Sequence, residues 1–234
     1  MSAATENGAG PKTESFVPNR ILVTGASGGL GGALARHYAR AGVEMSLWGR
    51  DAARLDAVAQ VCRRAGARVE VRSLDLTDID GALAALAEED AAGGYDLALL
   101  ASGRGDVRAA GDRVEDARMV ALLGTVNFVA PAAMAAALAA RMAARGHGRI
   151  VIVGSAAAFH ALPFAAAYSG TKAGLARFAD ALRLSVAGHG VRVTLVSPGF
   201  IDTAAGRKVP GPKPMLMKPE AVAARIARAA AQGK

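Results

Sequence analysis

A tyrosine, a lysine and a serine stand at spacings that could support proton transfer. Tyr168 and Lys172 lie four residues apart in a helical pattern, so both side chains fall on one helical face. A nearby ammonium group favours the tyrosinate and lowers the pKa of a tyrosine towards the working pH. Ser155 ends an apolar run thirteen residues before Tyr168. Such pairs also arise by chance on surfaces, so the prediction of an acid–base site depends on the motifs around them.

A glycine-rich turn follows the first apolar run and opens the first helical pattern. It reads Thr24-Gly25-Ala26-Ser27-Gly28-Gly29-Leu30-Gly31. Gly25 permits a tight turn, while Gly29 and Gly31 let the backbone approach a ligand and the helix pack close to the sheet. The helix N-terminus then offers free N–H groups to a pyrophosphate. Because the motif sits in the strand–turn–helix context that it requires, we predict dinucleotide binding rather than a purely structural turn.

The end of the second apolar run predicts which dinucleotide binds. An acidic residue there would bind the ribose 2′-hydroxyl of NAD, but the chain has Trp48-Gly49-Arg50, and Glu44 lies too far back. Arg50 could pair with the 2′-phosphate of NADP, with help from Ser27. The alternative is that Arg50 is a solvated charge beside Asp51. We predict NADP(H), with NAD(H) as the less favoured cofactor.

Six short apolar runs alternate with longer helical patterns. The runs are Ile21–Thr24, Val43–Trp48, Val69–Leu74, Leu97–Ala101, Ile150–Val153 and Val191–Val196. The helical patterns are Leu30–Ala41, Ala52–Ala65, Asp78–Glu89, Glu115–Arg145, Phe164–Ala187 and Pro219–Ala231. Continuous apolar runs are typical of strands that are buried on both faces. The alternation predicts an α/β fold, a doubly wound parallel sheet with helices on both faces.

The composition fits one folded domain. The chain has 234 residues, 52% hydrophobic and 21% charged, which excludes a disordered protein. Residues 1–19 are polar and predict a flexible tail rather than a targeting signal, so the domain is expected at 20–234. The longest weakly polar run, residues 128–140, stops at Arg141, short of the roughly 20 residues of a membrane span. We expect a cytoplasmic protein.

Histidine and cysteine usage gives no metal signal. The four histidines, at positions 37, 147, 160 and 189, are scattered without ligand spacing, so no metal site is expected. His160 follows Ser155 closely and could reach a substrate, although a plain loop histidine is the favoured interpretation. Cys62, the single cysteine, is interpreted as a small core residue.

Together these motifs resemble the classical form of the short-chain dehydrogenase/reductase (SDR) family, over residues 20–231. The glycine-rich turn matches the family's TGxxxGxG loop, and Tyr168-Ser169-Gly170-Thr171-Lys172 matches its YxxxK motif. Residues 197–203, with the sequence SPGFIDT, match the family's PG motif. The resemblance implies a Rossmann-type sheet in the order 3-2-1-4-5-6. Because residues 230–234 are too few for the seventh strand of many relatives, six strands are expected.

The resemblance assigns roles to the acid–base residues. Ser155 would hydrogen-bond the substrate carbonyl, and Tyr168 would give it a proton as NADPH delivers hydride, or take one in reverse. Lys172 would lower the pKa of Tyr168 and hold the nicotinamide ribose. Asn127, 28 residues before Ser155, would help a water chain to resupply the proton. An alternative register places Ala121 there, and the ungapped match favours Asn127.

The resemblance and the motifs together predict the cofactor contacts. Asp75 matches the acidic residue that the family places near the adenine, and Ile201 and Thr203 match positions that hold the nicotinamide carboxamide. The full predicted set is Gly25, Ser27, Gly28, Gly29, Leu30, Gly31, Arg50, Asp75, Leu76, Ser102, Gly103, Tyr168, Lys172, Pro198, Gly199, Ile201 and Thr203. One departure affects it: Leu100-Ala101-Ser102-Gly103 stands where the family has Asn-Asn-Ala-Gly. We expect Ser102 to replace some of the lost contacts.

The remaining charge suggests a ligand site. The formal charge is +8, and residues 200–234 hold seven basic and two acidic residues. A local patch in a chain with only 4% aromatic residues argues against nucleic-acid binding. Much of it falls at about 204–219, where the family carries a substrate lid. It is either a solvated basic loop or a lid that attracts an anionic substrate with basic residues and contacts an apolar part with Met215 to Met217.

We therefore predict an NADP(H)-dependent oxidoreductase that acts on a carbonyl or secondary alcohol. An isomerase or dehydratase with the same nucleotide site, and a non-enzymatic NADP-binding sensor, are the alternatives. The Ala-rich helix at 115–145 and the Tyr168 helix are elements that relatives use to assemble, so we expect a homodimer or homotetramer.

Overall fold

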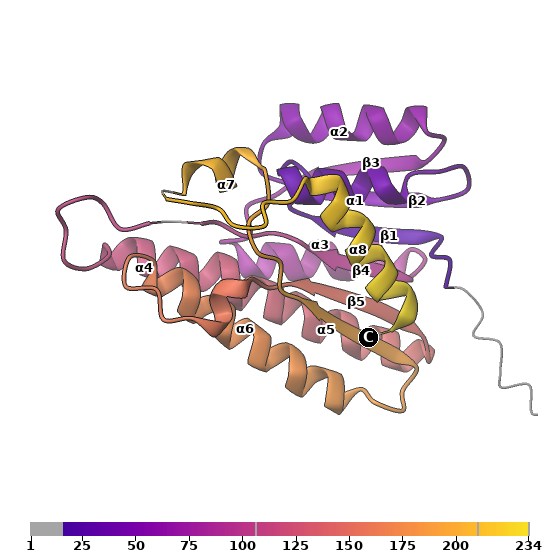
Figure 1. Ribbon diagram of the computed structural model, residues 1–234. Coiled ribbons are helices and arrows are strands. Elements are labelled where there is room, and N and C mark those ends of the chain that lie inside the picture. The colour runs from indigo at the N-terminus through magenta and orange to yellow at the C-terminus, as the bar shows by residue number, and fades with distance from the viewer. Residues whose placement is uncertain (1–15, 106, 210, 234) are drawn as a thin grey trace, which may run out of the picture.

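The computed structural model describes residues 16–105, 107–209 and 211–233 (Figure 1). Six parallel strands form one sheet in the order β3-β2-β1-β4-β5-β6, which confirms the predicted order. The strands are β1 (Arg20–Thr24), β2 (Glu44–Gly49), β3 (Arg68–Ser73), β4 (Leu97–Leu100), β5 (Gly148–Val153) and β6 (Val191–Val196). Their alignment is regular, with Thr24 opposite both Trp48 and Leu100, so the carboxyl ends of the central strands meet at one edge.

Helices cover both faces of the sheet. They are α1 (Gly29–Tyr38), α2 (Ala52–Arg64), α3 (Ile79–Ala91), α4 (Ala117–Gly124), α5 (Ala130–Arg145), α6 (Ala166–Ser185), α7 (Ala204–Lys208) and α8 (Pro219–Gln232). Helices α1, α2 and α8 pack on one face, and α3, α5 and α6 pack on the other (Figure 1). The fold class predicted from the sequence is confirmed.

The central strands are apolar because each of them packs against a core on both faces, whereas the edge strand β3, also predicted to be buried on both faces, is mostly exposed. Ile21 and Val23 pack under α1 and α8, whereas Leu22 between them points to the α3–α5 layer, and all three are wholly buried. Side chains that alternate across a strand explain this division. Burial of one such side chain contributes about 1.5–3 kcal/mol. Cys62 lies in the first of these cores, as predicted.

The predicted helix at 115–145 contains a π-helical segment. This segment, η1 (Thr125–Val129), joins α4 to α5 in one continuous helix. A π-helical turn widens the hydrogen-bond ladder locally and is often found at functional sites. Asn127 lies in the middle of it and is fully buried.

This continuous helix, Ala117–Arg145, is long and apolar enough by length and composition to cross a membrane, and an 18-residue window within it has a mean hydropathy of 1.7. The sequence analysis predicts no membrane-spanning segment here, because the apolar run ends at Arg141, so this candidate is not predicted. Met134, Leu138 and Met142 of the helix are fully buried against the sheet and neighbouring helices. A core helix meets the same two criteria, and 39% of that window is buried inside the fold.

Most of the predicted N-terminal tail, residues 1–15, lies outside the described residues. Of the four tail residues that the structure describes, Phe16, Pro18 and Asn19 contact the body of the fold. The Phe16 ring lies 3.9 Å from the Arg149 guanidinium, and the Asn19 backbone N–H donates to Asp96 at 2.8 Å.

Candidate active site

The glycine-rich turn is packed so tightly that side chains are excluded from it. Gly25 has a φ of +70°, and a Cβ there would lie 2.9 Å from the carbonyl oxygen of Ala101. A Cβ on Gly31 would collide with the Gly25 carbonyl group, so α1 begins directly on the turn. The N-cap of α1, Gly28, has no side chain to bond the first N–H groups of the helix. These groups therefore face outward from a bare backbone.

The second strand delivers Arg50 beside this turn. The Ala26 N–H donates to the Trp48 carbonyl at 2.9 Å, and a Cβ on Gly49 would lie only 2.6 Å from Ser27 Oγ. Ser27 therefore packs directly on Gly49, the residue before Arg50. Arg50 itself is exposed. Asp51 is occupied elsewhere, because it caps α2 and pairs with Arg54 at 2.6 Å.

Asp75 follows the third strand at the same edge. Its Oδ1 accepts from the Thr77 N–H at 2.9 Å, and this hydrogen bond holds the pKa of Asp75 below its usual value. The positive charge of Arg50 acts in the same direction. Asp75 thus presents an exposed, ionised carboxylate, and Leu76 after it is buried.

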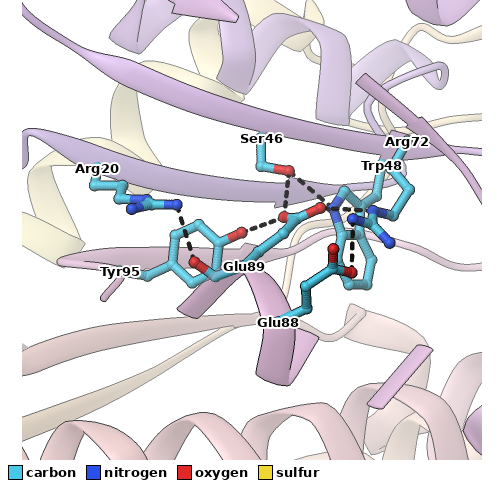
Figure 2. A network of polar contacts seen from close by, with 7 residues as sticks. All are labelled: Arg20, Ser46, Trp48, Arg72, Glu88, Glu89 and Tyr95. Atoms are coloured by element: carbon cyan, nitrogen blue, oxygen red, sulfur yellow. Dashed lines mark hydrogen bonds and ion pairs between the residues drawn. The ribbon is translucent and has the colours of Figure 1, made fainter. Parts of the chain in front are cut away.

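A buried polar cluster supports the end of the second strand, and the sequence analysis missed it. The carboxylate of Glu89 on α3 is 8% exposed and accepts from Ser46 Oγ at 2.6 Å, from Trp48 Nε1 at 3.2 Å and from the Tyr95 hydroxyl. Its other oxygen pairs with Arg72 Nε at 2.6 Å. Figure 2 shows the cluster, with Arg20 and Glu88 at its margins. Burial and the neighbouring carboxylate raise the pKa of Tyr95, so its hydroxyl stays protonated and donates.

The altered segment after the fourth strand is still braced. The Ser102 N–H donates to the Thr24 hydroxyl at 3.3 Å, which links the ends of β4 and β1. Gly103 comes next, and a Cβ there would lie 3.4 Å from both Asn127 Oδ1 and Lys172 Nζ. The structure therefore brings Gly103, Asn127 and Lys172 together.

Asn127 makes both of its side-chain hydrogen bonds with one residue. Its Oδ1 accepts from the Arg104 N–H at 2.7 Å, and its Nδ2 donates to the Arg104 carbonyl at 2.8 Å. The π-helical segment places this amide against the loop after β4. Ala121, the alternative of the sequence analysis, lies exposed on α4. The side chain of Asn127 thus braces the loop, and its role in a water chain stays a prediction.

Lys172 is buried at the carboxyl end of the fifth strand. It is 3% exposed, and its Nζ donates to the carbonyl of Val153 at 3.0 Å. Burial lowers the pKa of Lys172 from 10.5 to about 8, because the apolar surroundings penalise the charged form. At neutral pH the ammonium group therefore remains mostly protonated, one helical turn after Tyr168.

Tyr168 and Ser155 are half-buried at the same edge. Ser155 Oγ accepts from the Ala157 N–H at 3.2 Å and so starts the short 3₁₀ turn η2 (Ala156–Phe159). The hydroxyl proton of Ser155 is not used in this hydrogen bond. Neither η2 nor α7 is predicted by the sequence.

The start of the Tyr168 helix is capped from a distant segment. Its N-cap residue, Ala165, has no side chain that can accept, and Glu115 Oε2 instead accepts from the Ala167 N–H at 3.0 Å. The Arg108 N–H also donates to the Phe164 carbonyl at 2.8 Å. The sequence analysis missed Glu115, because nothing in its spacing indicates a contact 52 residues away.

The segment after the sixth strand lies on the glycine-rich turn. The Ala156 N–H donates to the Pro198 carbonyl at 2.9 Å, which joins the ends of β5 and β6. The Thr203 side chain fills the space that a Cβ on Gly29 would need, and its hydroxyl caps α7 through the Gly206 N–H at 3.0 Å. Ile201 pairs with Met217 in an isolated parallel bridge.

A hollow of about 320 Å³ lies between η2 and α6, lined partly by His160, Ser169 and Ala173. Ser155, Tyr168 and Lys172 are not among the residues that line it. The hollow is therefore separate from the acid–base residues, and His160 lines it.

Comparison with known proteins identifies the family. The model of the short chain dehydrogenase family matches residues 19–212. The chain belongs to the short-chain dehydrogenase/reductase family. It is 39% identical over 198 residues to an uncharacterised oxidoreductase of Myxococcus xanthus, which covers 84% of this chain and 78% of that protein.

Solved SDR structures share the fold. A short-chain dehydrogenase from Sphingobium yanoikuyae in complex with NADPH superposes with a TM-score of 0.82 at 28% identity, covering 92% of this chain and 85% of that one. The bulky-bulky ketone specific alcohol dehydrogenase from Comamonas testosteroni gives a TM-score of 0.80 at 25% identity, covering 93% and 84%. The chain is thus an oxidoreductase of the SDR family, a family that binds nicotinamide cofactors.

The glycine-rich turn of this SDR protein fits the diphosphate of such a cofactor. Gly28 and Gly29 are exposed, no acidic residue lies in the first turn of α1, and the first N–H groups of the helix have no side-chain cap. Free N–H groups and the positive end of the helix dipole stabilise an anion at this place.

Proposed function

We propose that this SDR protein is an NADP(H)-dependent oxidoreductase that interconverts a carbonyl group and a secondary alcohol. The observation that carries the proposal is the buried ammonium group of Lys172, 3.0 Å from the last carbonyl of β5 and one turn after Tyr168. Burial of a charged lysine side chain costs free energy unless the charge is paired or hydrogen-bonded. Its position beside Tyr168 and near Ser155 gives that charge a chemical use.

The proposed roles follow from the positions of these side chains. Ser155 donates a hydrogen bond to the substrate oxygen and fixes its place. Tyr168 transfers a proton to that oxygen, and the positive charge of Lys172 stabilises the tyrosinate that remains. Asn127 holds the loop that carries Gly103 against Lys172. When bound, the reduced nicotinamide supplies the hydride.

The preference for NADP(H) is proposed from the end of β2. Arg50 is exposed beside Ser27, and Asp51 is already paired with Arg54. A guanidinium and a hydroxyl group at this place suit a 2′-phosphate. The bound NADPH of the Sphingobium yanoikuyae relative supports the same choice. The remaining cofactor contacts are proposed as the sequence analysis gave them, from the glycine-rich turn to Thr203.

We also propose that the protein assembles into a homo-oligomer and works in the cytoplasm. Val120 and Val129 on the α4–α5 helix are each 43% exposed, and Leu184 on α6 is 74% exposed. Such apolar side chains on neighbouring helices favour association with a second copy. Light scattering coupled to gel filtration measures the mass directly, and a monomer would contradict this part of the proposal.

The test of the proposed reaction is a transfer of label. NADPH deuterated at the reactive carbon is mixed with a panel of ketones, and the alcohol products are examined by mass spectrometry. We expect one deuterium in the alcohol and an equivalent loss of NADPH absorbance. Tyr168→Phe should lower kcat/KM by ~10²–10⁴-fold, because it removes the proton donor. Tyr38→Phe, at the end of α1, is the matched control and should leave the rate unchanged.

Two results would contradict the proposal. Turnover without net loss of NADPH would indicate an isomerase or dehydratase. Binding of NADPH without turnover of any ketone, unchanged in Tyr168→Phe, would indicate a sensor.

A further inference from the structure

Residues 204–209 and 211–218, called the basic segment below, are tied to the active-site edge at both ends. At the start, Thr203 caps α7 through the Gly206 N–H at 3.0 Å. At the end, the Met217 N–H donates to the Phe200 carbonyl at 3.0 Å, and the Met217 carbonyl accepts from the Asp202 N–H at 2.9 Å. Figure 1 shows α7 at the same edge of the sheet as the starts of α4 and α6. The basic segment therefore lies beside the predicted carboxamide site.

Most of the positive charge of this segment is not neutralised by ion pairs. It contains four basic residues and no acidic one. Arg207 pairs with Asp202 at 2.6 Å. Lys208 is exposed, and Lys213 donates to the Gly211 carbonyl at 3.4 Å. Among the described residues, no carboxylate lies within ion-pair distance of either lysine. Two ammonium groups at the edge of a site attract an anionic ligand.

An apolar tip stands next to these lysines. Met215 is 89% exposed and has a φ of 53°, the one positive φ of a residue other than glycine in the part of the chain that the structure describes. A left-handed backbone is unfavourable for methionine, and an observed outlier of this kind points to function. Leu216 is 46% exposed. The unfavourable backbone conformation of Met215 and the exposure of both apolar side chains would be offset if an apolar ligand covered them.

A third apolar side chain marks the entrance of the Tyr168 helix. Phe164 is 41% exposed and precedes Tyr168 by four residues. Its backbone is held by the Arg108 N–H at 2.8 Å, so its position is fixed. Phe164 and the basic segment thus follow neighbouring strands, β5 and β6, at the edge that carries the acid–base residues.

We propose that the substrate is an amphipathic oxo acid or hydroxy acid, with an extended apolar body and a carboxylate distant from the reacting carbon. Lys208 and Lys213 attract the carboxylate, while Phe164, Met215 and Leu216 cover the apolar body. This inference rests on the proposed function, and it names the substrate class for the same site.

The charge is tested with matched substrates at saturating NADPH. Medium-chain oxo acids are compared with their methyl esters, which differ only in the negative charge. We expect a higher kcat/KM for the acids at low salt and a smaller difference at high salt, because salt screens exposed charges. In the double variant Lys208→Gln, Lys213→Gln, kcat/KM for the acids should fall by about fivefold through KM, as two exposed ion pairs allow. The esters should be unaffected.

A matched control loses a positive charge elsewhere. Arg64→Gln, on the exposed side of α2, removes one charge at a position with no ion pair among the described residues. It should leave kcat/KM unchanged for both the acids and the esters. Met215→Ser should raise KM about fivefold for a long-chain acid and leave a short-chain acid unchanged, because burial of apolar carbon is what it removes.

The outcomes separate this inference from the proposed function. Reduction of acids and esters at equal rates, or equal losses for both in the double variant, would overturn the substrate class and leave the oxidoreductase intact. A weaker Kd for NADPH in the double variant, with no change in acid preference, would assign the lysines to the cofactor. If no oxo acid is turned over, calorimetry measures the affinity of the wild type and the double variant for decanoate instead. Equal affinity in the wild type and the double variant would overturn the inference.

Discussion

Asn127 makes both of its side-chain hydrogen bonds to the backbone of one residue, Arg104, at 2.7 and 2.8 Å. The pair spans from the π-helical segment to the loop after β4. It sets Gly103 against Lys172, where a Cβ on the glycine would come within 3.4 Å of the ammonium nitrogen. The buried amide is therefore a brace for the acid–base residues as well as part of the core.

Asn127→Ala should destabilise the protein and lower its kcat. The substitution removes both side-chain partners of the half-buried backbone of Arg104, at a cost of about 0.5–1.5 kcal/mol for each lost hydrogen bond. The melting temperature should fall by several degrees, and kcat should fall while NADPH still binds. Ala121→Ser, at the rejected register, is the control and should stay within about 0.5 kcal/mol of the wild type. An unchanged melting temperature in Asn127→Ala would show that the brace contributes nothing.

The pH dependence of stability should report Lys172. Burial lowers its pKa to about 8 in the folded chain, whereas the unfolded value is 10.5. Between these values the unfolded chain binds the extra proton, so the free energy of unfolding rises with pH. Without cofactor, the wild type should gain stability relative to Lys172→Met from pH 8 to pH 10, with a limiting slope of about 1.4 kcal/mol per pH unit. Parallel curves for the two proteins would mean that the pKa is not lowered.

Glu115 should matter for the Tyr168 helix although it lies far from it in sequence. Glu115→Ala removes the oxygen that accepts from the Ala167 N–H, and loss of such a cap costs about 0.5–2 kcal/mol. Glu115→Gln keeps an accepting oxygen and should lose less. We expect kcat to follow the same order, measured beside Glu70→Ala on the exposed side of β3. Equal effects of the alanine and glutamine substitutions would contradict a capping role.

Glu88 and Glu89 should differ sharply although both pair with Arg72. Glu89 is buried and accepts three hydrogen bonds, so its replacement by alanine removes the acceptor of three buried donors, at a cost of about 1–3 kcal/mol for each donor left unpaired. Glu88 has a side chain that is 71% exposed, and its pair should contribute no more than about 1 kcal/mol. Chemical unfolding followed by the fluorescence of Trp48 measures both. Similar losses in the two variants would contradict the assignment of the buried cluster.

The sequence predicts those parts of the molecule that depend on local patterns. The strands follow from apolar runs such as Ile21–Thr24, and their order follows from the resemblance to the SDR family. The glycine-rich turn follows from its place between a strand and a helix. The spacing of Tyr168 and Lys172 places them on one helical face.

Contacts between distant segments are not predicted, because they leave no periodic signal. Glu115 reaches Ala167 across 52 residues, and Asn127 reaches Arg104 across 23. The burial of Glu89 follows only from the way in which α3 packs on β2. The π-helical segment is also invisible, because its residues fit an ordinary helix equally well.

The most direct test of the central claim is a parallel titration of the protein with NADPH and NADH, followed by nicotinamide fluorescence. We predict that NADPH binds about tenfold to a hundredfold more tightly, because a charge-assisted contact from Arg50 to the 2′-phosphate contributes about 1.5–3 kcal/mol. In Arg50→Gln this preference should disappear while NADH binding stays the same. Equal or tighter binding of NADH by the wild type would contradict the cofactor assignment, and binding of neither would contradict the oxidoreductase itself.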